Sequence, residues 1–360
     1  MKVGLIGAGS ISGVYLQVAR RFPMIEIVAV ADIVPENAQR RAEEFGIPKV
    51  CSPEDLLADP EIEAVLNLTI PKAHAEVNRM ALEAGKHVYC EKPLGVNREE
   101  ARAVLELARA KGLRVGCAPD TFLGAGHQTC RKLIDDGSIG EPIGAVAFML
   151  SRGVESWHPN PEFYYEPGGG PMLDMGPYSL TDLVNLMGPM KRVAGISRIT
   201  FPTRFVTSQP KYGTVIEVQT PTHITGAIEF HSGAIATVVM SFDVWAHRLP
   251  CIEIYGTEGS LAVPDPNGFG GTVLLRSKER SDWTEVPHTH PYDTQSRILG
   301  LAEMILAIQE GRPHRASGEL AYHVLDAMLA FNESSESQTH RVLESTCTQP
   351  APMPIEGLPS

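Results

Sequence analysis

The chain has 360 residues and a mass of 39.1 kDa, more than one compact core usually contains, so we expect two domains. Hydrophobic residues make up 43% of the chain and charged residues 21%, which is the composition of a globular protein and excludes a disordered or fibrous one. The formal net charge is -12 and no run is rich in Lys and Arg, which argues against a nucleic acid or an anionic membrane surface as a partner.

Other features of the composition bear on location and metal content. No apolar segment reaches the roughly 18 residues of a membrane span, and the chain opens on a strand-like run, so we expect a cytoplasmic protein without a membrane partner. The six cysteines include no CxxC pair, which predicts reduced thiols. The segment "HTHPY" at 288–292 has two histidines without a clear third ligand, so we expect no metal.

The first third of the chain alternates short apolar runs with helical patterns. The runs, rich in β-branched residues, lie at 2–6, 26–31, 63–69, 87–90 and 114–118, and the helical patterns at 10–21, 35–45, 73–84 and 97–111. Strands that alternate with helices of this length predict right-handed βαβ units and a parallel sheet. Residues 1–122 are therefore expected to form a doubly wound α/β domain of the Rossmann type.

The first turn of this domain has the pattern of a dinucleotide-binding site. Gly7 and Gly9 permit a tight turn and a close approach of a pyrophosphate to the start of the next helix. Ser12 stands where this pattern has Gly or Ala, and it is small enough for helix–strand packing. Asp32, 20 residues after Ser12 at the end of the second strand, can accept hydrogen bonds from an adenosine ribose.

The residues after Asp32 decide between the two nicotinamide cofactors. Residues 33–36 offer no cation for a 2′-phosphate, so we expect NAD, and NADP is the weaker alternative because Arg40 and Arg41 follow on the helix. An ordinary loop or helix-capping role for Asp32 stays open.

The pattern changes from about residue 123. Helical patterns at 126–136, 171–187, 295–310 and 317–335 surround strand-like runs at 143–150, 222–230, 234–243 and 251–256. Turn signals at 231–233 and 257–259 separate some of these runs and predict hairpins. Residues 123–360 are therefore expected to form an α+β domain with an open, largely antiparallel sheet and helices on one face. The Pro-rich tail, 346–360, is expected to pack against the rest.

Four segments together resemble one protein family. They are the Gly-rich turn, "TIPKAH" at 69–74, "ALEAGKHVYCEKP" at 81–93 and "GGGPMLDMGPY" at 168–178, and their order and spacing are similar to those of the Gfo/Idh/MocA oxidoreductases. The resemblance spans nearly the whole chain. It implies an N-terminal Rossmann domain and a C-terminal α+β domain whose open sheet often builds the oligomer interface, so we expect a homo-oligomer, a dimer or a tetramer.

The resemblance also implies site residues. The expected catalytic residues are Lys92, Asp174 and Tyr178, and the expected cofactor-binding residues are Gly7, Gly9, Ser10, Ile11, Asp32, Thr69, Pro71, His74 and Glu91. Lys92 follows the fourth predicted strand, whose carboxyl end opens on the crevice where such sheets bind ligands. An unperturbed lysine, with a pKa of about 10.4, is a poor base at neutral pH, so we expect burial and an oxidised nicotinamide to lower its pKa. The alternative is a surface Glu91–Lys92 pair that closes a loop.

Asp174 and Tyr178 are spaced i, i+4 and so share one face of a predicted helix, although an exposed pair would show the same spacing. Many relatives have His where this chain has Tyr178. A phenol relays protons well but needs a cationic neighbour to act as a base, and Lys92 could be that neighbour. A second departure is Thr181, where relatives commonly have Asp; here the nearby acid is Asp182, one residue out of register.

A segment dense in aromatic residues, 152–166, precedes the Gly triad. Aromatic faces beside polar groups suit a polyhydroxylated ring, so Arg152, Trp157 and His158 are expected to contact the substrate. A loop whose aromatics only fill the domain junction is the alternative.

These features predict an NAD(P)-dependent dehydrogenase that acts on a secondary alcohol of a sugar, glycoside or cyclitol. Two alternatives stay open: a non-catalytic dinucleotide-binding sensor or repressor, and an enzyme that keeps NAD bound and uses it transiently for hydrolysis or elimination.

Overall fold

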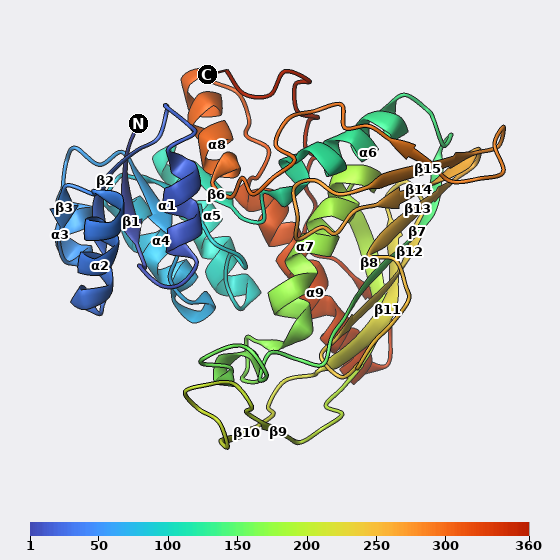
Figure 1. Cartoon of the computed structure of the whole chain (residues 1–360), viewed down its shortest axis with the longest axis horizontal. Helices are drawn as coiled ribbons and strands as arrows, with labels where there is room; N and C mark the ends of the chain where they lie inside the picture. Colours follow the sequence, from blue (N-terminus) through green and yellow to red (C-terminus); the bar gives the residue numbers. More distant parts are fainter. Residues whose placement is uncertain (360) are drawn as a thin grey trace.

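The computed structural model describes residues 1–359 and contains two large sheets with helices between and around them (Figure 1). The elements of the first part are β1 (Lys2–Ile6), α1 (Ser12–Ala19), β2 (Glu26–Ala31), α2 (Pro35–Phe45), β3 (Lys49–Val50), α3 (Pro53–Ala58), β4 (Ala64–Asn67), α4 (His74–Glu83), β5 (His87–Cys90), α5 (Arg98–Lys111) and β6 (Val115–Cys117).

The first sheet confirms the predicted doubly wound fold. Its strand order is β3-β2-β1-β4-β5-β6, and every neighbouring pair is parallel. The strand order reverses between β1 and β4, and ligands bind at the carboxyl ends of strands beside such a reversal. The sequence patterns missed β3 and α3, because β3 has only two residues, both exposed, and α3 has only six.

The second part contains α6 (Ala125–Asp135), β7 (Pro142–Leu150), α7 (Gly170–Met187), β8 (Met190–Arg198), β9 (Thr203–Phe205), β10 (Val215–Glu217), β11 (His223–Phe230), β12 (Ile235–Ser241), β13 (Ile252–Gly256), β14 (Gly259–Val263), β15 (Val273–Ser277), β16 (Thr284–Val286), α8 (Leu299–Gln309), α9 (Gly318–Ser337) and β17 (Arg341–Val342). Nine strands form a sheet of order β16-β15-β14-β13-β7-β12-β11-β8-β17, in which only β7 and β12 are parallel, and β9 and β10 form a separate pair. The predicted largely antiparallel sheet is confirmed.

One face of the nine-stranded sheet packs against α7 and α9, which lie between the two sheets in Figure 1. Small residues permit this close approach. A Cβ on Gly195 would lie 2.6 Å from the carbonyl oxygen of Phe331 in α9, and one on Gly226 would lie 2.8 Å from a ring carbon of Phe331. The glycines therefore bring the helix onto β8 and β11.

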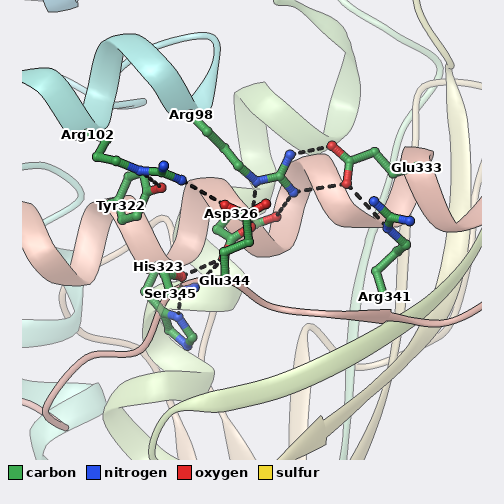
Figure 2. A network of polar contacts seen from close by, with 9 residues as sticks. All are labelled: Arg98, Arg102, Tyr322, His323, Asp326, Glu333, Arg341, Glu344 and Ser345. Atoms are coloured by element: carbon green, nitrogen blue, oxygen red, sulfur yellow. Dashed lines mark hydrogen bonds and ion pairs between the residues drawn. The ribbon is translucent and has the colours of Figure 1, made fainter.

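A polar network fixes helix α5 of the first part onto α9 (Figure 2). Arg98 Nε donates to Oδ1 of the buried Asp326 at 2.6 Å, and Arg98 Nη2 donates to Glu333 Oε2 at 3.1 Å. Asp326 Oδ2 also accepts from the backbone N–H and the hydroxyl of Ser345, at 2.8 and 2.7 Å. Arg98 follows the loop that carries Lys92 by a few residues, so the network holds that loop against the second part of the chain.

Two further expectations bear on the same junction. Helix α8 begins at Leu299, later than the predicted 295, because Ile298 has a φ of 94° that no α-helix accommodates. The tail packs as expected: Met353 N donates to Gln128 Oε1 at 2.8 Å and Leu358 N donates to the Tyr292 hydroxyl at 2.9 Å. Among residues 1–359, no helix combines the length and the apolar character needed to cross a bilayer.

Candidate active site

The turn between β1 and α1 has the geometry of an anion-binding loop. Gly7 has a φ of 99°, and a Cβ there would lie 2.6 Å from the carbonyl carbon and oxygen of Leu68, so only glycine fits. A Cβ on Gly9 would meet nothing within 4 Å, which leaves open space above the turn. In residues 1–359 the backbone N–H groups of Gly9, Ser10 and Ile11 have no acceptor, so they are free to bind a phosphate at the start of α1.

Asp32 joins the end of β2 to this turn. Its Oδ2 accepts from Ala8 N at 2.7 Å and its Oδ1 from Val34 N at 2.8 Å. Each carboxylate oxygen has a second lone pair, so the side chain can still accept from a ribose hydroxyl. The structure therefore places Asp32 beside the Gly-rich turn, as the spacing predicts.

Arg40 and Arg41, the two arginines that could bind the 2′-phosphate of NADP, both form hydrogen bonds within the protein. Arg41 Nε donates to Ser12 Oγ at 3.0 Å, and its Nη2 donates to the carbonyl oxygen of Gly9 at 3.2 Å. Arg40 Nη2 donates to Asn37 Oδ1 at 3.2 Å within α2. A 2′-phosphate would have to compete with these contacts.

His74 lies beneath two loops of the expected cofactor site. Its Nδ1 is 2.7 Å from the Pro93 carbonyl oxygen and its Nε2 is 3.0 Å from that of Thr69, next to the short 3-10 turn that begins at Pro71. Burial opposes a charge, but the Cys90 sulfur and these carbonyls outweigh it and raise the pKa of His74 to about 9. Both ring nitrogens can then donate, so His74 ties the loop after β4 to the loop that carries Lys92.

Glu91 is buried and its carboxylate is shared between two donors. Oε1 accepts from the Tyr15 hydroxyl at 2.7 Å, and Oε2 accepts from the backbone N–H of Lys92 at 2.8 Å. These bonds fix the backbone of the following lysine relative to α1. No sequence motif indicates Tyr15 as a residue of the site.

Lys92 meets Asp174 where the end of β5 approaches helix α7. Lys92 Nζ lies 2.9 Å from Asp174 Oδ1 and 2.8 Å from the Asp174 carbonyl oxygen, and 16% and 19% of the two side-chain surfaces remain exposed. Burial alone lowers the pKa of Lys92, as expected, but Asp174, Tyr178 and Glu91 reverse this effect and raise the pKa well above its usual range. The expectation of a lowered lysine pKa is therefore corrected, and Lys92 is an ammonium.

Tyr178 lies one helical turn after Asp174, also near Lys92, and is buried. The ammonium nitrogen is 5.2 Å from the centre of the Tyr178 ring, and the Tyr178 hydroxyl is 3.5 Å from Nη2 of Arg297. The structure thus brings Lys92, Asp174 and Tyr178 together, as the helical spacing predicts. It adds a second cation, Arg297, that the sequence patterns missed.

The Gly triad sets the start of helix α7. Gly168 and Gly170 have φ values of 92° and 87°, and a Cβ on Gly169 would lie 2.4 Å from the Phe163 carbonyl oxygen. The chain can therefore turn sharply beneath the aromatic segment before the helix begins at Gly170.

The aromatic segment reaches this group through its residue Tyr164. The His158 ring packs edge-on against Trp157 and Tyr164, with centroids 5.4 and 5.1 Å apart. Burial, and then the charge of Asp174, raise the pKa of Tyr164. Trp157 is 64% exposed, and the His158 ring lies between the rings of Trp157 and Tyr164.

Arg152 takes part in a different cluster. Its guanidinium carbon lies 4.7 Å from the Phe201 ring centre and 4.6 Å from that of Trp245. None of the contacts found for Arg152 joins it to Lys92, Asp174 or Tyr178 within residues 1–359. Its part in substrate binding stays a prediction.

The acid one residue out of register faces away from this group. Asp182 is buried, and its Oδ2 lies 2.7 Å from Nδ1 of His127, while His127 Nε2 lies 3.1 Å from the Gly268 carbonyl oxygen. Thr181 is buried as well. Neither side chain supplies the acid that many relatives have here.

The two histidines of the "HTHPY" segment each bond a backbone carbonyl. His288 Nε2 lies 2.8 Å from the Gly271 oxygen, and His290 Nε2 lies 3.2 Å from the Met353 oxygen. Across residues 1–359, no group of three or more His, Cys, Asp or Glu side chains is arranged to hold a metal ion.

A Rossmann sheet with a phosphate-binding turn, joined to an α+β part that brings a carboxylate and a phenol to a lysine, defines the class of nicotinamide-dependent oxidoreductases. The profile of the oxidoreductase family with an NAD-binding Rossmann fold matches residues 1–118, and that of the GFO/IDH/MocA C-terminal domain matches residues 127–262. The chain belongs to the Gfo/Idh/MocA oxidoreductase family.

Relatives of known name span almost the whole chain. A 1,5-anhydro-D-fructose reductase of Ensifer adhaerens is 32% identical over 324 residues, covering 88% of this chain and 90% of the relative. A D-glucoside 3-dehydrogenase of Escherichia coli K12 is 30% identical over 356 residues, covering 94% and 96%. A levoglucosan dehydrogenase structure, in complex with NADH and levoglucosan, is 23% identical with a TM-score of 0.82, covers 95% of this chain and 99% of that chain, and shows the shared fold.

Proposed function

We propose that this protein is an NAD-dependent dehydrogenase that oxidises, or in reverse forms, a secondary alcohol of a sugar, glycoside or cyclitol. The observation that carries the proposal is the meeting of Lys92, Asp174 and Tyr178 between the two sheets, with Lys92 and Asp174 in part open to solvent. Relatives of matching length are named for reactions on carbohydrate rings, which supports the substrate class.

The residues around the first turn fit a dinucleotide. The free N–H groups of Gly9, Ser10 and Ile11 would hold the pyrophosphate and Asp32 the adenosine ribose, with Thr69, Pro71 and Glu91 in the loops that follow β4 and β5. When bound, NAD accepts or supplies the hydride. The occupied guanidinium groups of Arg40 and Arg41 favour NAD over NADP.

The charges of the site support one assignment of the proton transfer. Lys92 uses two of its three N–H donors on Asp174, so one donor remains for a substrate oxygen. In oxidation, Tyr178 as the phenolate accepts the hydroxyl proton while the Lys92 ammonium stabilises the negative charge on that oxygen. In ketone reduction, the same pair returns the proton.

The aromatic segment is proposed as the wall that receives the sugar ring. Trp157 is largely exposed, and its neighbour His158 packs against both Trp157 and Tyr164, whose pKa the charge of Asp174 helps to raise. Apolar faces of pyranose and cyclitol rings pack on such surfaces, while Arg152 at the start of the segment would reach outlying hydroxyls.

We also propose a homo-oligomer, formed through the sheet face opposite α7 and α9. Ile196 pairs with Thr225, Thr225 with Val239, and Val239 with Phe148, so these four residues form one stripe across the outer face. Ile196 is 71% exposed in the single chain. A second copy would cover this apolar stripe.

A sugar panel tests the proposed function. The protein is incubated with NAD⁺ or NADP⁺ and methyl glucoside, 1,5-anhydroglucitol, levoglucosan or myo-inositol, and both the reduced cofactor and the sugar products are measured. Free NADH in proportion to a ketone product supports the proposal. Changed sugars without free NADH would instead indicate transient use of bound NAD, and cofactor binding without any sugar change would indicate a sensor.

A further inference from the structure

Arg297 is a charged side chain of the site that no sequence motif indicates. It lies in the segment between β16 and α8, and its Nη2 is 3.5 Å from the Tyr178 hydroxyl. The other contacts of the guanidinium are with amide oxygens: Asn267 Oδ1 accepts from Nη2 at 2.6 Å, and Gln295 Oε1 accepts from Nη1 at 3.1 Å.

The charge of Arg297 is not cancelled by an ion pair. Within residues 1–359 no carboxylate lies within 4.0 Å of its guanidinium, whereas Arg98, Arg131 and Arg204 each pair with one or two carboxylates. Burial opposes the charge of Arg297, but Tyr178, Tyr15 and Asp120 outweigh it and raise the arginine pKa. The cation that contacts the Tyr178 oxygen is therefore both charged and without an ion-pair partner.

The backbone beside Arg297 is held in an unusual conformation. Ile298 has a φ of 94°, which a β-branched residue adopts only where the surroundings enforce it. The buried Asp120 enforces it: its Oδ2 accepts from Ile298 N at 3.0 Å and from Gly300 N at 2.9 Å. Strain of this kind clusters at functional sites, and here it lies next to the residue whose guanidinium reaches Tyr178.

The loop that carries Asn267 is fixed as well. The carbonyl oxygen of the next residue, Gly268, faces Nε2 of the buried His127, which in turn pairs with Asp182. Asp182, the acid one residue after the position where relatives commonly have Asp, thus supports the loop that holds Arg297. The loop after β14, helices α6 and α7, and the segment after β6 that carries Asp120 therefore all help to fix the position of one guanidinium.

We propose that Arg297 is a positioning residue that stabilises the phenolate form of Tyr178, which accepts the substrate proton. This rests on the proposed function, in which Tyr178 carries that proton. The titratable and charged groups that face Tyr178 are Lys92 from the end of β5, Asp174 on its own helix, Tyr164 from the aromatic segment, and Arg297. Lys92 lies against the ring, whereas Arg297 contacts the oxygen on which the negative charge forms.

The test follows the ionisation of Tyr178 itself, by absorbance at 295 nm in the full-length protein between pH 6 and 11. The Tyr178 step is the one that disappears in Tyr178→Phe. We expect this step to move up by about one pH unit or more in Arg297→Gln, and to stay near the wild-type position in Arg297→Lys, which keeps the charge. Arg21→Gln is the matched control, because Arg21 contacts the Gln295 carbonyl from an exposed position without reaching Tyr178.

An unchanged Tyr178 step in Arg297→Gln would overturn the proposal, and so would a wild-type protein without a Tyr178 step in this range. The experiment needs no substrate, so its result is separate from the proposed function. Hydride transfer gives a second reading: the pH at which sugar oxidation reaches half its maximum should rise in Arg297→Gln by the same amount. A merely structural role would lower the rate without moving this pH.

Discussion

Lys92 and Asp174, which are separated by 82 residues of sequence, form a 2.9 Å ion pair that joins the end of strand β5 to helix α7. Because the first belongs to the parallel sheet and the second to the helix that covers the mixed sheet, the pair exists only when the two parts of the chain are docked. The same contact keeps the lysine protonated, so docking and the charge state of the site are coupled.

The first prediction concerns this charge state. In Asp174→Asn, burial is no longer outweighed by the neighbouring carboxylate, so the pKa of Lys92 should fall by about one to three units. A raised lysine pKa keeps the ammonium present to higher pH, so the rate of ketone reduction should decline at a lower pH in the variant than in the wild type. The pH profile of reduction measures this. Asp135→Asn, on an exposed acid of α6, should leave the profile unchanged.

The second prediction concerns cofactor choice. Removing the Asp32 carboxylate in Asp32→Ala should weaken NAD binding by about tenfold, because a hydrogen bond from the ribose to a charged acceptor is lost. The proposed preference for NAD over NADP should shrink as well. Dissociation constants for both cofactors, with Glu36→Ala as an exposed control, check this. Equal affinities of the wild type for NAD and NADP would contradict the role given to Asp32.

The third prediction concerns the network in Figure 2. Arg98→Met leaves the carboxylate of Asp326, whose side chain is 1% exposed, without its cation, so the free energy of unfolding should fall by about 3 kcal/mol. Arg102→Met removes an ion pair with the exposed Glu344 on the same helix face, and because solvent screens this pair the loss should be much smaller. Denaturant unfolding of both variants makes the comparison. Equal losses would show that burial of the Arg98 pair has no special effect.

The fourth prediction concerns assembly. A charge placed in the centre of the outer stripe, in Val239→Glu, should convert the proposed oligomer to a monomer, because the carboxylate would be buried without a partner. Light scattering at several concentrations measures the mass. The control is Glu279→Gln in the exposed β15–β16 turn, away from the stripe. Thr237 is unsuitable as a control position because it lies on the same face of the sheet as Val239. A wild-type monomer at every concentration would contradict the proposed interface.

Local patterns in the sequence predicted the parts of the site that depend on short spacing. Gly7, Gly9 and Asp32 form one motif at a strand end, and Asp174 and Tyr178 share a helix face, so their positions follow from the geometry of single elements. Strand β8 escaped prediction because the charged residues of "MKRVAGISR" interrupt its alternation.

The missed residues reach the site through long-range contacts. Arg297 is 119 residues from Tyr178, and its position depends on the φ of the adjacent Ile298 and on Asp120 and Asn267, which lie in two other parts of the chain. No periodicity or spacing records such a meeting. Tyr164 lay inside the aromatic segment that the sequence singled out, but Trp157 and Phe163 also pack against His158, and nothing in the local sequence indicates that the charge of Asp174 acts on Tyr164 in particular.

The central claim is that Lys92 and Tyr178 act as one proton-transfer unit. Single-turnover hydride transfer is measured in Lys92→Ala, Tyr178→Phe and the double variant with NAD⁺ and the best sugar of the panel, and Lys278→Ala controls for the loss of an exposed lysine. Each single variant should still bind NAD and should lose roughly a hundredfold or more in rate, and the double variant should lose little more than either one. Near-normal transfer in Lys92→Ala, or losses that multiply in the double variant, would contradict the claim.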